Sequence, residues 1–194
     1  MATWCVRVMQ EAKSAVTMAD GIGTDLRPAV FGWRDDRCIG YAQLKNVEKD
    51  DLLQLAKISE AAGLMRSGWG IEAAVLGSEN FVATGADHND DSLAKRFAEG
   101  DTNVVETITV LAVHLDEALV LSMPYRYEIG RTVAWDTPLL LEGVPMAAEY
   151  PSSLARALTA EPEPDTETVR VATAHTLSEL GFAVRTYEGF LPES

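Results

Sequence analysis

The densest group of potential metal ligands lies in the segment Asp87-His88-Asn89-Asp90-Asp91. Calcium and magnesium prefer several oxygen ligands from one flexible loop, and this segment offers them. Its spacing differs from the twelve-residue EF-hand loop, which needs a glycine at the sixth position and a glutamate at the twelfth. Asp87, His88, Asp90 and Asp91 are therefore candidate ligands of a divalent metal, and the alternative interpretation is a solvated acidic loop.

A second acidic pair, Asp35-Asp36, precedes Lys45 and is similar to the acid and x-Lys elements of restriction-type nucleases. An extended strand would separate the aspartates from Lys45 by about 30 Å, at about 3.3 Å per residue. These residues could then share a metal ion only if the chain folded back. His114 and Asp116 alternate onto one face of a predicted strand, but no second histidine accompanies them.

No arrangement for nucleophilic catalysis is visible in the sequence. Gly77-Ser78-Glu79 lacks the G-x-S-x-G elbow, and neither Cys5 nor Cys38 has a histidine nearby. We therefore predict no catalytic residue. A site assembled from distant residues would leave no such local pattern, so an enzyme stays an open alternative.

The elements that position these residues are organised around the stretch from Val104 to Ile129. Two runs of β-forming residues flank an acidic pair, which predicts a long β-hairpin with its tip at Asp116-Glu117. One face of this hairpin is apolar, whereas the other is half polar. We therefore expect another layer of structure on the apolar face, and partial cover or a partner on the half-polar face. The predicted pairs on the apolar face are His114 with Leu119, Ala112 with Leu121, Val110 with Met123 and Ile108 with Tyr125.

The half-polar face and the aromatic residues on or beside strands give the candidate binding residues. Tyrosine and tryptophan are enriched at binding hot spots, although their usual place is the core. If some of them are exposed around the half-polar face, they would mark an interface. The candidates are Trp33, Leu111, Val113, Tyr125 and Tyr127.

The remaining pattern predicts an α+β fold, an antiparallel sheet of hairpins with helices packed mainly on one face. Residues 29–44 predict a second hairpin around Asp35-Asp36, with Arg34 opposite Arg37, Trp33 beside Cys38 and Phe31 over Gly40. Helical spacing covers residues 3–19, 52–65, 152–158 and 166–180, and short strands are expected at 71–76, 81–84, 132–135 and 139–141. We expect one domain over residues 1–160. Residues 161–194 then form an acidic, proline-containing spacer with a last helix and strand, packed on the same domain.

The charge balance limits the classes of partner. The chain has 194 residues and a net charge of −14, which argues against binding DNA or RNA through a basic face. No apolar run is long enough to span a membrane and no secretory signal is visible. Two cysteines are few for a disulfide scaffold, so we expect reduced thiols and a cytoplasmic location.

The order LRPAVFGWRDDRCIGYAQL, a capped Asp-Asp-Leu-Leu helix, EAAVLGSENFVAT and VLSMPYRYE resembles uncharacterised proteins of actinobacteria and their phages. The resemblance spans roughly residues 24 to 136 and implies no activity and no catalytic residue. The element order is also distantly similar to roadblock or profilin-like scaffolds, which implies a fold and not a function.

Three hypotheses follow from the sequence. The first is a non-catalytic, acidic cytoplasmic interaction protein, of phage origin and acting on a host protein. The second is a metal-dependent hydrolase or nuclease built from Asp87, His88, Asp90, Asp91 or His114. We expect no cofactor, and a divalent metal is the alternative that this second hypothesis requires. The third is a structural homodimer, with the half-apolar face of the central hairpin as its seam. The expected partner is thus another protein or a second copy of the chain.

Overall fold

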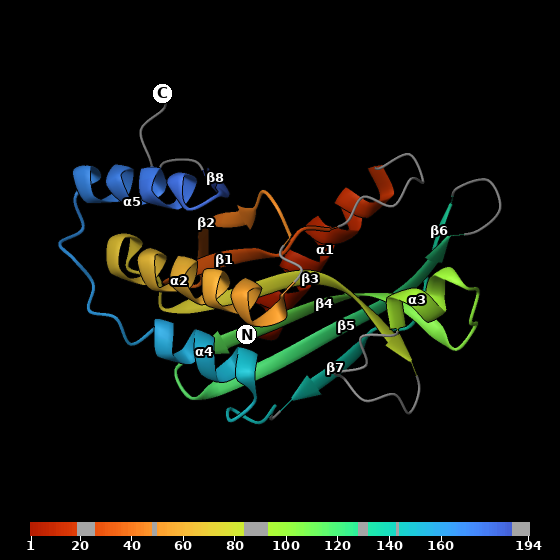
Figure 1. Cartoon of the computed structure of the whole chain (residues 1–194). Coiled ribbons are helices and arrows are strands. Elements are labelled where there is room, and N and C mark those ends of the chain that lie inside the picture. The colour runs from red at the N-terminus through yellow and green to blue at the C-terminus, as the bar shows by residue number, and fades with distance from the viewer. Residues whose placement is uncertain (19–25, 48–49, 84–92, 128–131, 143, 188–194) are drawn as a thin grey trace.

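The computed structural model describes residues 1–18, 26–47, 50–83, 93–127, 132–142 and 144–187. The chain alternates helices and strands in the order shown in Figure 1. The helices are α1 (Ala2–Met18), α2 (Asp51–Trp69), α3 (Leu93–Ala98), α4 (Glu149–Ala157) and α5 (Glu167–Glu179). The strands are β1 (Ala29–Arg34), β2 (Arg37–Leu44), β3 (Ala73–Ala83), β4 (Val104–His114), β5 (Glu117–Tyr127), β6 (Val133–Trp135), β7 (Leu139–Glu142) and β8 (Phe182–Thr186).

The strands form one antiparallel sheet in the order β6-β5-β4-β3-β1-β2-β8, and β7 also pairs with β5. Neighbouring strands pair antiparallel throughout this sheet. The predicted α+β class is therefore confirmed. None of the described helices is long and apolar enough to cross a lipid bilayer.

The hairpin of β1 and β2 turns at Asp35 and Asp36, as the sequence predicts. Both residues have positive φ, 50° and 57°, which is typical of a two-residue hairpin turn and is tolerated by aspartate. The predicted pairs Arg34 with Arg37 and Trp33 with Cys38 are confirmed.

The predicted placement of Phe31 over Gly40 is wrong. A register shift between Gly32 and Trp33 pairs Gly32 with Gly40 and Phe31 with Tyr41. Both glycines are close to other elements. A Cβ at Gly32 would lie 2.5 Å from Ile71 Cγ2, and one at Gly40 would lie 2.6 Å from the carbonyl oxygen of Arg185 in β8.

The central hairpin of β4 and β5 forms with a register two residues away from the predicted one. His114 pairs with Glu117, so the turn lies at Leu115 and Asp116, and Leu115 takes a φ of 53°. A shift of two residues leaves every side chain on its predicted face, because side chains alternate with a period of two. The apolar face is therefore as predicted, although its pairs are Ala112 with Leu119, Val110 with Leu121 and Ile108 with Met123.

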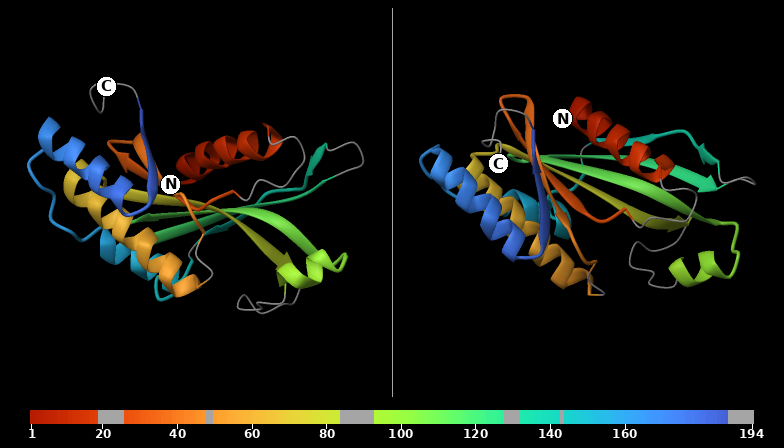
Figure 2. Two further views of the ribbon diagram at one scale, coloured as in Figure 1. Left: turned by 45° about the horizontal axis from the view of Figure 1, so that its top comes forward. Right: turned by 90° about the horizontal axis from the view of Figure 1, so that it is seen from above.

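Helices cover both faces of the sheet, as Figure 2 shows. On one face lies α1, whose buried side chains pack on the apolar face of the central hairpin. On the other face lie α2, α4 and α5 (Figures 1 and 2). Leu111 and Val113, which are apolar residues of the half-polar face, belong to this second core. Helices, and not a partner, therefore cover them.

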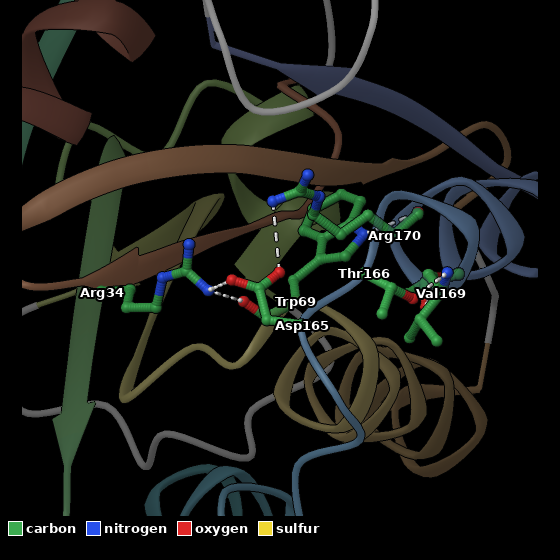
Figure 3. A network of polar contacts seen from close by, with 7 residues as sticks. Arg34, Trp69, Asp165, Thr166, Val169 and Arg170 are labelled. Atoms are coloured by element: carbon green, nitrogen blue, oxygen red, sulfur yellow. Dashed lines mark hydrogen bonds and ion pairs between the residues drawn. The ribbon is translucent and has the colours of Figure 1, made fainter.

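The chain after the spacer packs on the same sheet as far as it is described. Strand β8 pairs with β2, and α5 packs beside α2, where Gly68 and Thr173 meet. Figure 3 shows the polar network that holds the start of this segment. Asp165 accepts hydrogen bonds from Arg34 at 3.1 Å and from Arg170 at 3.2 Å, and the indole of Trp69 donates to the Arg170 carbonyl at 3.1 Å.

Candidate functional site

The predicted metal ligands Asp87, His88, Asp90 and Asp91 lie outside the described residues. Within the described part of the chain, no three His, Cys, Asp or Glu side chains gather as a metal ion would require. His114 lies edge-on to the ring of Trp4, with a centroid distance of 5.9 Å.

Four of the five predicted binding residues are core residues. Trp33, Leu111, Val113 and Tyr125 are buried, so they do not form an exposed binding face. The prediction of an exposed patch built from these four is wrong, because the helices on both faces cover them. The fifth, Tyr127, pairs through its backbone with Val133, and its side chain lies outside the description.

Helix α1 is held on its face of the sheet by aromatic and charged contacts. The rings of Trp4 and Trp33 stack with centroids 5.4 Å apart, and the Arg7 guanidinium lies over the rings of both Trp33 and Tyr187. The hydroxyl of Tyr187 donates a hydrogen bond of 2.7 Å to the Glu11 carboxylate. Through these contacts Trp33 holds α1 against the sheet, which is a packing role and not a ligand-binding one.

The two thiols are enclosed in the same core. Both cysteines are free and buried. Burial raises the pKa of Cys5 and of Cys38 to about 11, which leaves them protonated at neutral pH. A protonated thiol is a poor nucleophile and a poor metal ligand, so the geometry gives these cysteines a packing role.

The surface hollows of the described structure include two that border the sheet. One, of about 110 Å³, lies between α1 and the sheet and is lined mainly by apolar side chains, among them Val8, Ala12 and Phe31. The other, of about 80 Å³, lies at the junction of β5 and β6 and is lined by Val105, Pro124, Tyr125, Arg126, Ala134, Trp135 and Asp136. Each has room for a few waters or one small side chain, which is small for a substrate or cofactor site.

The most unusual surface feature is strand β7. Its three leucines, Leu139, Leu140 and Leu141, are 55%, 44% and 47% exposed. By the register, Leu140 is opposite Leu121 on the α1 side of the sheet, whereas Leu139 and Leu141 belong to the other side. The strand therefore presents apolar side chains on both sides of the sheet.

Strands β6 and β7 continue one another along the outer side of β5. Trp135 pairs with Tyr125, the Asp136 N–H donates to the Pro124 carbonyl at 2.9 Å, and Leu139 pairs with Ser122. The edge of the sheet is thus a nearly continuous run from Val133 to Glu142. No strand pairs with the outer side of this run among the described residues. We call the run from Leu139 to Glu142 the leucine edge.

Acidic side chains lie near both ends of the leucine edge. Glu142 ends it, Asp136 precedes it, and Asp116 and Glu117 form the neighbouring end of the central hairpin. Because Glu142 is opposite Leu119, Glu117 is its diagonal neighbour across the strands, at about 7–8 Å between backbone positions. Arg126 lines the same hollow as Asp136, so the negative charge is concentrated at the other end of the leucine edge, at Glu142, Glu117 and Asp116. We call these three residues the acidic surround.

Comparison with protein-family models, with curated proteins and with solved structures finds no match, so the argument for function rests on this geometry. Sequence reasoning places a strand at residues 139–141 but misses the leucine edge as a site. The available signal is three successive leucines after a proline. Such a run is apolar on both faces, as in a strand that is covered on both faces of the sheet.

Proposed function

We propose that this protein acts by binding another protein and not by catalysis, and that its contact surface is centred on the leucine edge. The observation that carries the proposal is the exposure of Leu139, Leu140 and Leu141 beside an open sheet edge. Exposed apolar strands at a sheet edge favour association with another chain, and natural proteins usually protect them. An unprotected apolar edge strand is expected in a protein whose partner covers that strand in the functional complex.

The two free, buried thiols support a cytoplasmic place of action, since reducing conditions preserve them. The net charge of −14 supports an acidic surface that meets a basic partner. A phage origin, with a host protein as the target, stays a prediction from the sequence.

The proposal is tested by site-specific photo-crosslinking in cells of the organism that encodes the chain. A benzoylphenylalanine replaces Leu140 in one variant and Val171 of α5 in the control. Val171 is also an exposed apolar residue, with an exposed fraction of 45% against 44% for Leu140, but it lies in α5, beside the opposite edge of the sheet. We expect one defined polypeptide to crosslink at position 140 and not at position 171.

A competition experiment separates specific binding from chance proximity. Excess unlabelled protein should suppress the crosslink at position 140, whereas excess Leu140→Glu protein should not. Crosslinking that is equal at both positions, or absent at both, would contradict the proposal. Circular dichroism of the Leu140→Glu protein checks its folding, and Leu140→Ser provides a milder second variant.

A further inference from the structure

The three leucines of the leucine edge lack the usual protection of a sheet edge. Natural edge strands commonly carry charged residues that discourage pairing with a further strand. The opposite edge of this sheet is partly guarded by charge, because β8 buries Phe182 and exposes Arg185, although its first three residues are also apolar. At the leucine edge, three large apolar side chains occupy successive positions on the two sides of the sheet, and all three are exposed.

The backbone of the leucine edge offers hydrogen bonds to a further strand. Successive residues of a strand direct their N–H and C=O groups alternately to its two sides. Strand β7 uses one side to pair with β5. The groups on its other side face no strand in the described structure. An added strand would satisfy them and would place its side chains beside the leucines on both faces.

The charge around the leucine edge decides between possible occupants. A second copy of the chain would bring a further net charge of −14, including its own Asp136 and Glu142, to the same place. Like charges brought into an interface oppose association. A segment with positive side chains would instead be attracted by Glu142, Glu117 and Asp116.

We infer that the occupant of the leucine edge is an extended segment of a partner protein, with basic side chains between apolar ones, which pairs with β7 as an added strand. Strand addition of this kind is a general mode of peptide recognition, in which backbone hydrogen bonds supply affinity and side chains supply specificity. The inference rests on the proposed binding function of the same surface and specifies the chemistry of the partner.

The test uses an eight-residue peptide of alternating lysine and valine, titrated into the full-length, nitrogen-15-labelled protein at physiological salt. Two matched peptides keep its charge: one replaces the valines by serine, and the other carries N-methyl groups on alternate backbone amides. We expect the alternating peptide to shift the amide resonances of residues 139–142 and to slow their hydrogen exchange. Both matched peptides should bind at least roughly tenfold more weakly, which corresponds to about 1.4 kcal/mol.

A charge variant tests the role of the acidic surround. Glu142→Gln should weaken binding of the alternating peptide by roughly two- to fivefold, as expected for a carboxylate at the rim of an interface. Glu161→Gln is the control, because Glu161 is exposed in the spacer before α5 and lies away from β7. Equal effects of the two substitutions would overturn the assignment of the acidic surround to partner binding.

The outcomes distinguish this inference from the proposed function. If position 140 crosslinks one polypeptide but the N-methylated peptide binds as tightly as its parent, or the parent does not bind, the strand inference is wrong and the binding function stands. If position 140 crosslinks nothing, both are wrong. If the protein sediments as a dimer and Leu140→Glu makes it a monomer, the edge is an interface between copies, and the inference of a basic partner is wrong.

Discussion

Replacing Gly68 by alanine should destabilise the protein, although alanine is the better helix former. Gly68 lies in α2 where this helix meets α5, and a Cβ there would overlap Thr173 Oγ1 and fall 2.8 Å from Thr173 Cβ. Thr173 has little freedom to move away, because it is buried and its hydroxyl donates to the Val169 carbonyl at 2.8 Å. Overpacking of this kind costs about 1–3 kcal/mol or more. The gain in helix propensity is smaller, at most about 1 kcal/mol.

The same helix supplies a matched control at Gly63. A Cβ at Gly63 would meet no atom nearer than those of Ala157 at 3.9 Å. Gly63→Ala should therefore raise the free energy of unfolding by up to about 1 kcal/mol. Because both variants share the gain in propensity, the difference between them isolates the clash, roughly 1–3 kcal/mol. Urea denaturation followed by circular dichroism measures it, provided that the slopes of the two transitions agree.

Equal stability of the two variants would refute the close approach of α2 and α5 at Gly68. A double-mutant cycle with Thr173→Ala adds a second check. That substitution removes Thr173 Oγ1 and Cγ2, the first of which makes the shortest contact, so Gly68→Ala should cost less in its presence. We expect a coupling of at least about 0.5 kcal/mol, whereas simple additivity would place the strain elsewhere.

Further predictions concern the face of the sheet that α1 covers. Tyr187→Phe removes the 2.7 Å hydrogen bond to Glu11 and should lower the free energy of unfolding by about 1–2 kcal/mol, measured by thermal denaturation. Cys5 and Cys38, whose pKa burial raises to about 11, should not react with a disulfide reagent at pH 8 until the protein unfolds. Folding raises both thiol pKa values above their ordinary value of 9.0, so the unfolded chain loses these protons at a lower pH than the folded protein does. The free energy of unfolding should therefore be unaffected by the thiols below pH 9 and should fall as the pH rises toward 11. Each thiol contributes up to about 3 kcal/mol to that decrease, and replacing both by alanine should flatten the dependence of the urea midpoint on pH.

The faces of the central hairpin could be predicted from the sequence, but its register could not. Alternation with a period of two assigns each side chain to a face whatever the register, provided that any slip is an even number of residues. The tip depends on the turn, and here Leu115 takes a positive φ, which is unusual for a leucine. The turn at Asp35-Asp36 could be predicted, because aspartate tolerates a positive φ. The shift between Gly32 and Trp33 does have a local signal, because a glycine inside a strand, here Gly32 and Gly40, often marks a bulge or a close approach of other elements.

The leucine edge could not be predicted as a site from the sequence, because no local pattern contains the necessary information. Residues 139–141 read as a strand, and the structure confirms it. Whether that strand lies inside the sheet or at its edge depends on which strands pair with it, and this is a property of the whole fold. Likewise, Leu111 and Val113 are exposed on an isolated hairpin and become buried only because distant helices pack over them.

The dependence on salt separates the two kinds of association that an exposed apolar edge allows. Pairing between copies is opposed by charge repulsion, because each chain carries a net charge of −14, and salt would screen that repulsion. Binding of a basic segment is assisted by attraction, and salt would weaken it. Raising the ionic strength from about 0.05 to 0.5 M shortens the screening length about threefold. The affinity for the alternating lysine and valine peptide should therefore fall, while sedimentation velocity reports whether dimers appear. A peptide affinity that is unchanged or higher at the higher salt would show that the acidic side chains around Leu140 do not select the partner.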